Sequence, residues 1–145
     1  MILIAHRGNI DGPNPEKENH PDYIINAISE GYDSEIDIWY KDGKIFLGHD
    51  NPQYEIDKYF LLKFKEKLWC HAKNSIALKK LIDIDMHCFF HNTDDVVLTS
   101  KKYLWTYPGK ELVKGSISVM PEINNDNTDQ CIGICSDLIG RYKTQ

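Results

Sequence analysis

Long apolar segments, paired cysteines and an excess of basic residues are all missing from this 145-residue sequence. No apolar run approaches the roughly 20 residues that a membrane-spanning helix requires, so we expect no integral membrane segment. The opening residues MILIAHRG lack the basic region, the longer apolar stretch and the cleavage site of a signal peptide, so we expect no secretory leader. The net charge of -5 disfavours nucleic acid as a partner, because phosphate backbones bind basic surfaces.

The four cysteines include no CxxC pair. Buried, reduced thiols in a cytoplasmic protein are the simplest interpretation, and a metal pair of Cys131 and Cys135 is a weaker alternative. A hydrophobic content of 41% and a charged content of 27% are ordinary for a globular chain. With this length, we expect residues 1–145 to form a single domain with a sizeable core.

Predicted strands and helices alternate along the chain. Met1–Ala5 is an apolar strand, a helix is expected from Pro21 to a stop at Gly31, and Asp42-Gly43 predicts a hairpin that returns through 44–47. The other expected strands are residues 34–39, 68–73, 87–91, 103–107, 116–120 and 132–135. The other expected helices are residues 57–65, 76–82, 96–100 and a brief one that ends near Gly115.

This alternation favours a parallel sheet covered by helices, either closed as a (β/α) barrel or open and doubly wound. In both folds, reactive residues gather at the carboxyl ends of the strands. Polar residues of this sequence follow that rule at or just past the predicted strand ends: His6-Arg7, Lys73-Asn74, His91-Asn92, Glu122 and Asp137. The repeated placement predicts one functional site at that edge of the sheet.

Glu35 and Asp37 lie two residues apart on a predicted strand, so both carboxylates point to the same face. Two adjacent like charges are unfavourable unless a cation or a shared proton relieves them. The return strand then delivers His49-Asp50 near the same strand end. This segment can form a metal site, and a buried structural pair remains the alternative.

Five ordered blocks in the first third of the chain resemble the glycerophosphodiester phosphodiesterases, within the phospholipase-C-like phosphodiesterase superfamily. The blocks are His6-Arg7-Gly8, Glu18-Asn19-His20, Glu35-x-Asp37, Asp42-Gly43 and His49-Asp50. The likeness loosens afterwards, at Lys73, Trp105-Thr106 and residues 133–137. It implies a distorted TIM barrel, which normally needs about 200 residues or more. We therefore expect an α/β fold that is a compact, trimmed or irregular TIM-type (β/α) barrel, with about seven parallel strands and a β-hairpin after the second strand.

The resemblance also implies roles for individual residues. His6 and His49 would be the catalytic acid/base pair, and Glu35 and Asp37 the metal carboxylates, with Mg²⁺ or Ca²⁺ as the expected divalent cation. The expected substrate-binding residues are Arg7, Glu18, Lys73 and Trp105, although Trp105 can equally be a core residue.

The metal set departs from the family at one position. His71 stands where the family has its third metal ligand, a glutamate. A histidine there shifts the preference toward Mn²⁺ or Zn²⁺. Otherwise Glu122 or another residue replaces it, or the site is degraded.

These residues predict a metal-dependent phosphodiesterase that hydrolyses a glycerophosphodiester or a similar small phosphodiester in lipid metabolism. The alternative is a catalytically weak phosphate- or metal-binding module on the same scaffold. A third possibility, an interaction protein that uses the fold as a platform, has little positive support. The oligomeric state is left open.

Overall fold

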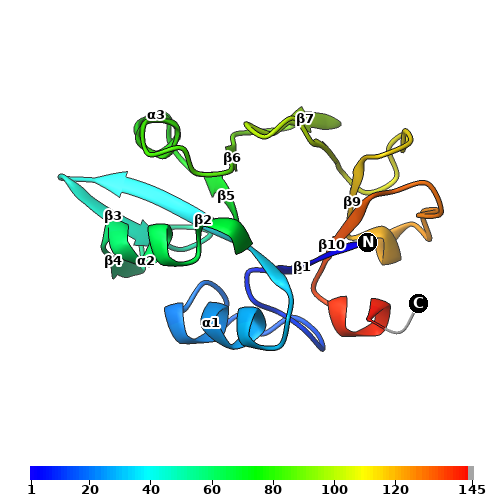
Figure 1. Cartoon of the computed structure of the whole chain (residues 1–145), viewed down its shortest axis with the longest axis horizontal. Coiled ribbons are helices and arrows are strands. Elements are labelled where there is room, and N and C mark those ends of the chain that lie inside the picture. The colour runs from blue at the N-terminus through cyan, green and yellow to red at the C-terminus, as the bar shows by residue number, and fades with distance from the viewer. Residues whose placement is uncertain (144–145) are drawn as a thin grey trace.

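One curved sheet of 10 strands runs through the computed structural model, which describes residues 1–143 (Figure 1). The strands are β1 (Ile2–His6), β2 (Asp33–Lys41), β3 (Lys44–Leu47), β4 (Tyr54–Ile56), β5 (Leu68–Ala72), β6 (Cys88–Phe89), β7 (Val96–Leu98), β8 (Leu104–Thr106), β9 (Ile117–Val119) and β10 (Gly133–Ser136). Strands β6, β5, β2, β1, β10, β9 and β8 are neighbours in that order and pair in parallel. Strands β3 and β4 extend antiparallel from the far half of β2, and β7 is antiparallel to β8.

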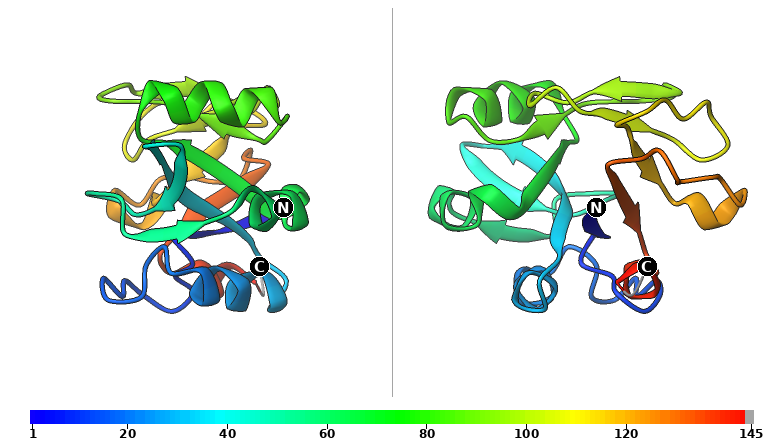
Figure 2. Two further views of the ribbon diagram at one scale, coloured as in Figure 1. Left: turned by 90° about the vertical axis from the view of Figure 1, so that its left-hand side faces the viewer. Right: turned by 45° about the vertical axis from the view of Figure 1, so that its right-hand side comes forward.

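The sheet bends into a half-barrel whose two ends, β6 and β7, approach each other (Figures 1 and 2). No strand pairing joins β6 to β7 within residues 1–143. His87 Nε2 instead lies 2.7 Å from Thr99 Oγ1, and a second contact is made by Ser100, just after β7. Its N–H donates to the Cys88 carbonyl at 2.8 Å, and its Oγ accepts from the Cys88 N–H at 2.9 Å.

The expectation of a TIM-type (β/α) barrel is wrong, because the sheet is mixed and helices follow only some of its strands. Residues 1–143 contain three α-helices: α1 (Pro21–Ser29), α2 (Lys58–Lys63) and α3 (Ser75–Asp83). Three short 3-10 turns accompany them: η1 (Lys65–Lys67), η2 (Pro121–Ile123) and η3 (Ile139–Tyr142). None of the helices in this described part is long and apolar enough to cross a bilayer.

Two predicted helices are replaced by other structure. The segment expected as a helix over 96–100 contains β7, because the β-branched Val96 and Val97 favour a strand and pair with Thr106 and Trp105. The helix expected before Gly115 is a loop of turns, since Pro108-Gly109 and Gly115 bracket too few residues for a stable helix. A chain of this length cannot supply a helix for every strand.

Local signals placed the other expected elements close to where the structure has them, whereas β4, η2 and η3 were not expected from the sequence. The hairpin between β2 and β3 turns at Asp42 and Gly43, whose φ angles of 52° and 75° are those of a two-residue primed turn. Each α-helix has a side-chain cap: His20 Nδ1 accepts from the Asp22 N–H, Asp57 caps α2 and Asn74 caps α3.

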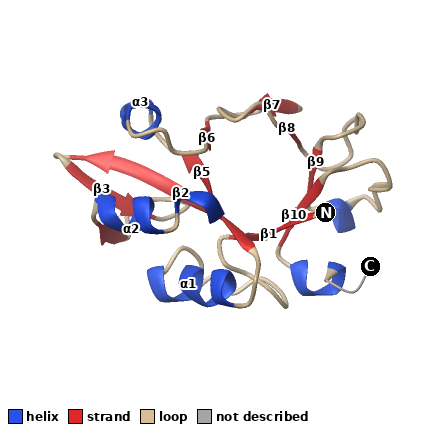
Figure 3. Ribbon diagram, in the orientation of Figure 1, coloured by secondary structure: helices blue, strands red, loops and turns tan. Residues whose placement is uncertain are grey.

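The two faces of β2 have different chemistry. Ile36 and Ile38 are fully buried and belong to a core cluster that includes Leu61 of α2 and Leu81 of α3. The three α-helices lie outside the arc of strands (Figure 3). Because side chains alternate along a strand, Glu35 and Asp37 point to the opposite, inner face. The fold therefore places the two carboxylates inside the half-barrel.

Candidate active site

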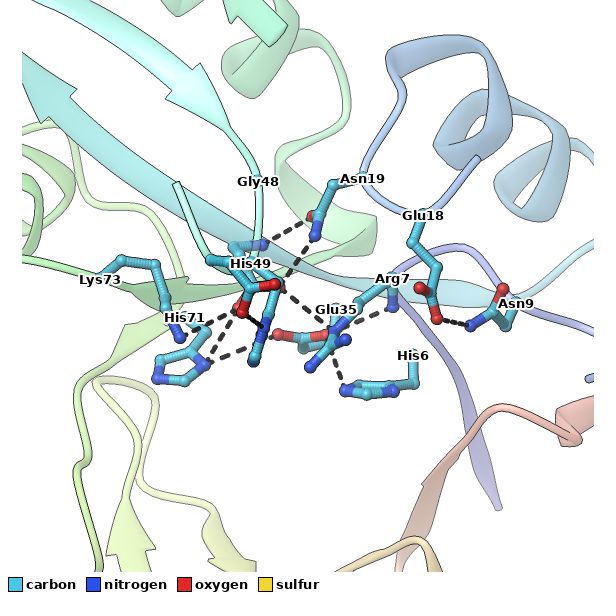
Figure 4. A network of polar contacts seen from close by, with 12 residues as sticks. His6, Arg7, Asn9, Glu18, Asn19, Glu35, Gly48, His49, His71 and Lys73 are labelled. Atoms are coloured by element: carbon cyan, nitrogen blue, oxygen red, sulfur yellow. Dashed lines mark hydrogen bonds and ion pairs between the residues drawn. The ribbon is translucent and has the colours of Figure 1, made fainter. Parts of the chain in front are cut away.

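A cavity of about 280 Å³ opens on the inner face of the sheet, and most of the predicted site residues line it. Figure 4 shows several of these side chains converging from β1, β2, β5 and the loop after β3. The predicted residues on the cavity wall are His6, Arg7, Glu35, Asp37, His49, His71 and Trp105. Residues far apart in the sequence thus share one cavity.

The metal-competent group consists of Glu35, Asp37 and His71, all of them buried. Strands β2 and β5 pair with Asp37 opposite His71, which brings the imidazole beside both carboxylates. One ligand atom from each of the three residues lies within 4.8 Å of the others. The Nδ1 atom of His71 is 3.2 Å from Asp37 Oδ1 and 3.9 Å from Glu35 Oε1.

The geometry of this group suits a cation better than a hydrogen bond. Asp37 Oδ1 is buried and accepts no hydrogen bond from any residue in the described range 1–143, although His71 Nδ1 lies only 3.2 Å away. A buried carboxylate oxygen without a donor is costly, and a divalent ion between these atoms would remove that cost. Two carboxylates and one imidazole form a donor set that suits Mn²⁺ or Zn²⁺ and that Mg²⁺ also accepts.

The two carboxyl groups have opposite pKa shifts. Burial raises the pKa of Glu35, and the neighbouring Asp37 carboxylate raises it further. Burial also opposes the charge on Asp37, but the nearby His71 and Arg7 and the amide of Asn19 outweigh it, so the pKa of Asp37 lies below its usual range. Asp37 is therefore the carboxyl group of the pair that keeps its negative charge more readily, and a cation placed here would compete with a proton at Glu35.

Asn19 and Arg7 hold Asp37 in place. Asn19 Nδ2 donates to Asp37 Oδ2 at 2.9 Å, and Asn19 Oδ1 accepts from the Asp37 N–H at 2.9 Å. Arg7 Nε lies 3.4 Å from the same Oδ2. Both Arg7 and Asn19 have the left-handed backbone, with φ of 54° and 65°, and the Asn19 N–H donates to the Arg7 carbonyl. This hydrogen bond joins the two ends of the connection between β1 and α1, and both ends thereby support Asp37.

Each predicted catalytic histidine is paired with an aspartate through Nδ1. His6 Nδ1 lies 2.8 Å from Asp137 Oδ1, and His49 Nδ1 lies 2.8 Å from Asp50 Oδ1. Because an ionised carboxylate can only accept, Nδ1 is the donor in each pair and Nε2 is left free to exchange protons. His6 Nε2 is 3.7 Å from Glu35 Oε2, at the edge of the metal-competent group.

The environment of His6 favours its protonated form. Burial alone would lower the pKa of His6, but the hydrogen bond to Asp137 and the charge of Glu35 raise it above its usual value. Asn9 donates from Nδ2 to Asp137 Oδ1 at 2.8 Å and to Glu18 Oε1 at 2.7 Å. Asp137 was predicted only as a polar strand end. Its place after the last strand was the one signal that could have made it a candidate partner for His6.

The loop that carries His49 depends on a glycine. A Cβ atom at Gly48 would lie 2.1 Å from the Asn51 carbonyl oxygen, so no side chain fits there. The Gly48 N–H donates to the Asp37 carbonyl, and the Gly48 carbonyl accepts from Trp39 Nε1 at 2.7 Å. This tight turn fixes His49 beside the carboxylates, although its side chain remains 42% exposed.

Three predicted substrate residues have different surroundings. Glu18 lines a neighbouring cavity of about 270 Å³, which shares Arg7 and His49 with the first. Lys73 Nζ lies 3.9 Å from Asp37 Oδ1 but is not on the cavity wall. Trp105 is 2% exposed and packs against Phe89, so it forms the floor of the cavity as part of the core.

Two more residues were candidates for this site, and only one of them lines the cavity. His91 was expected at the functional edge of the sheet without a role of its own; it lines the cavity and stacks on His71 with ring centres 4.6 Å apart. Burial and the neighbouring His71 and Lys73 lower the pKa of His91 to about 4. Glu122, the alternative metal ligand, instead accepts a hydrogen bond from Ser136 Oγ at 2.6 Å. It lies outside the metal-competent group.

Comparison of the chain with protein-family models, with curated proteins and with solved structures gives no match in any of the three. The likeness seen in the motifs therefore stays a prediction. The function has to be inferred from the chemistry of the cavity.

Proposed function

We propose that this protein is a metal-dependent phosphodiesterase that hydrolyses a glycerophosphodiester or a similar small phosphodiester. The observation that carries the proposal is the convergence of two imidazoles, a guanidinium and the Glu35–Asp37–His71 group on one cavity. A phosphodiester needs these three kinds of group: cationic contacts for its oxygens, a base for the attacking hydroxyl and an acid for the leaving alcohol.

Arg7 is the residue best placed to bind the phosphate. Its guanidinium borders both cavities, and within residues 1–143 its buried Nε makes only the 3.4 Å ion-pair contact with Asp37 and no hydrogen bond. A planar guanidinium can hold two phosphate oxygens at once. Lys73 adds a second positive charge near Asp37 and strengthens the attraction for an anionic substrate.

Proton transfer is assigned to the free Nε2 atoms of His6 and His49. One imidazole takes the proton of the attacking hydroxyl as its oxygen bonds to phosphorus, and the other donates a proton to the alcohol oxygen as the P–O bond breaks. With water as the nucleophile, the products are a phosphomonoester and an alcohol. Attack by a neighbouring hydroxyl of the substrate would instead give a cyclic phosphate. Asp137 and Asp50 keep each imidazole in the required tautomer and orientation.

Glu35, Asp37 and His71 would hold the divalent cation. When bound, such a cation neutralises negative charge that develops on the phosphoryl oxygens. The raised pKa of Glu35 means that binding releases a proton from this carboxyl at acidic pH.

The test is hydrolysis of bis(p-nitrophenyl) phosphate by the metal-stripped protein after addition of Mg²⁺, Ca²⁺, Mn²⁺ or Zn²⁺. His6→Ala and His49→Ala should each lower kcat by about 10²- to 10⁴-fold. His20→Ala is the matched control, because His20 caps α1 and does not line the cavity. No cation-dependent turnover, or turnover that survives both substitutions, would favour the phosphate- or metal-binding module.

We also propose a cytoplasmic location. Cys70 and Cys88 are both buried and unpaired, although β5 and β6 place them side by side. Thiols in this state persist in reducing compartments.

A further inference from the structure

A second cavity lies on the outer face of the sheet and takes no part in the chemistry above. It has a volume of about 250 Å³ and lies between the β2–β3 hairpin, α2 and α3. The left-hand view of Figure 2 looks toward this side of the molecule. Ile38 contributes to its wall, whereas the adjacent Asp37 lines the inner cavity, so strand β2 separates the two.

The wall of this outer cavity is apolar. Its uncharged lining residues are Ile38, Tyr40, Ile45, Leu61, Leu81 and Ile84. An apolar cavity of about 150 Å³ in another protein stays dry and takes up benzene. At the same density, the larger volume here has room for about eight to ten carbon atoms. A small apolar group is therefore the expected occupant of the interior.

Two lysines at the cavity favour an anionic ligand. Lys58 and Lys80 line it, and within residues 1–143 neither ammonium group has a carboxylate within 4.0 Å. Each lies over an aromatic ring instead, Lys80 over Tyr40 at 5.6 Å and Lys58 over Tyr59 at 5.5 Å. The single acidic lining residue, Asp83, already pairs with Lys79. Two uncompensated positive charges thus stand beside an apolar interior.

We propose that this cavity binds a medium-chain monocarboxylate, with its alkyl chain among the apolar side chains and its carboxylate at Lys58 and Lys80. Inorganic phosphate would satisfy the lysines but leave the interior unfilled, and a neutral alkane would leave the lysines unpaired. An amphiphile with one negative end matches both parts of the cavity.

The experiment titrates the 145-residue chain with octanoate and follows backbone amide shifts by NMR, with butyrate and octanol as comparison ligands. Octanoate should bind saturably and shift the amides of Ile38, Ile45 and Leu81. Each CH₂ group between butyrate and octanoate should tighten binding by about fourfold. Octanol should bind more weakly than octanoate, because it cannot pair with the lysines.

Lys58→Met and Lys80→Met should each weaken octanoate binding by about two- to fivefold, the usual worth of a partly exposed ion pair. Lys63→Met is the matched control: Lys63 also lies on α2 over an aromatic ring, that of Phe64, but does not line the cavity. Its substitution should leave octanoate binding unchanged. Absence of saturable octanoate binding, or equal affinity for octanol together with unaffected lysine variants, would overturn the proposal.

Discussion

Addition of a divalent cation should raise the thermal stability of this protein, and Glu35→Gln should abolish the rise. The residues Glu35 and Asp37 are 2% and 1% exposed, and they have ligand oxygens within 4.8 Å of each other. At an effective dielectric constant of about 20, two full charges at that separation repel by about 3.5 kcal/mol. A bound cation replaces this repulsion by attraction to both groups.

The expected size follows from mass action. A ligand that binds only the folded chain, present at about 100 times its Kd, stabilises it by about 2.7 kcal/mol. For a protein of this size, each kcal/mol of added stability raises Tm by about 2–4 °C. The cation should therefore raise Tm by about 5–11 °C. Because His71 supplies an imidazole, Mn²⁺ and Zn²⁺ should act at lower concentrations than Mg²⁺ or Ca²⁺.

The assay is thermal unfolding by circular dichroism of the metal-stripped protein, with and without each cation. Without metal, Glu35→Gln should unfold at the same temperature as the wild type or a few degrees higher, because the substitution removes the like-charge repulsion. Its Tm should no longer respond to cations. Glu122→Gln is the control, since Glu122 bonds to Ser136 outside the metal-competent group, and it should keep the full response. A wild-type Tm that ignores all four cations, or a Glu35→Gln variant that keeps the rise, would refute this reasoning.

Three further outcomes are expected. Asp137→Asn should lower the pKa of His6, measured by NMR titration of the ring, and reduce turnover at least tenfold, because the amide does not hold the imidazolium; an unchanged titration would contradict the pairing. Gly48→Ala should destabilise the fold by about 1–3 kcal/mol in urea unfolding, since its Cβ would overlap the Asn51 carbonyl, and wild-type stability would contradict that overlap. Burial lowers the pKa of His87 to about 4, below its unfolded value near 6.5, so stability should fall as pH drops from about 6.5 to 4; His87→Phe should flatten that slope, and an unchanged slope would count against the assignment.

The elements that local chemistry dictates were predictable from the sequence. Asp42-Gly43 specifies its own hairpin, and His20-Pro21 specifies the start of α1. The trimmed or irregular TIM-type barrel was wrong for a different reason: helices were expected at positions such as 96–98, where the chain forms a strand. Their β-branched side chains form an antiparallel strand once β8 offers a partner. The partner strand follows only a few residues later, and the β-branched pair was the local signal that favoured a strand over a helix.

In the candidate site, too, local motifs predicted part of the arrangement, and the rest depends on which strands are neighbours. The motifs predicted that His6, Glu35, Asp37 and His49 share one site, and all four line one cavity. Their roles stay predictions. The partnership of His6 with Asp137 joins residues 131 positions apart, and it depends on β1 and β10 being neighbours in the sheet. Sequence reasoning could mark Asp137 as a polar strand end but could not choose its partner.

Strand β2 links the integrity of the fold to the presence of the site. If β2 slipped by one residue against β1 and β5, the isoleucines would enter the inner cavity and the acids would lie beneath the helices. A shift of one residue in the register of β2 would therefore remove the acidic group from the cavity and the isoleucines from the core in a single event. The protein has no intermediate register in which it keeps a stable interior but loses its acidic pocket.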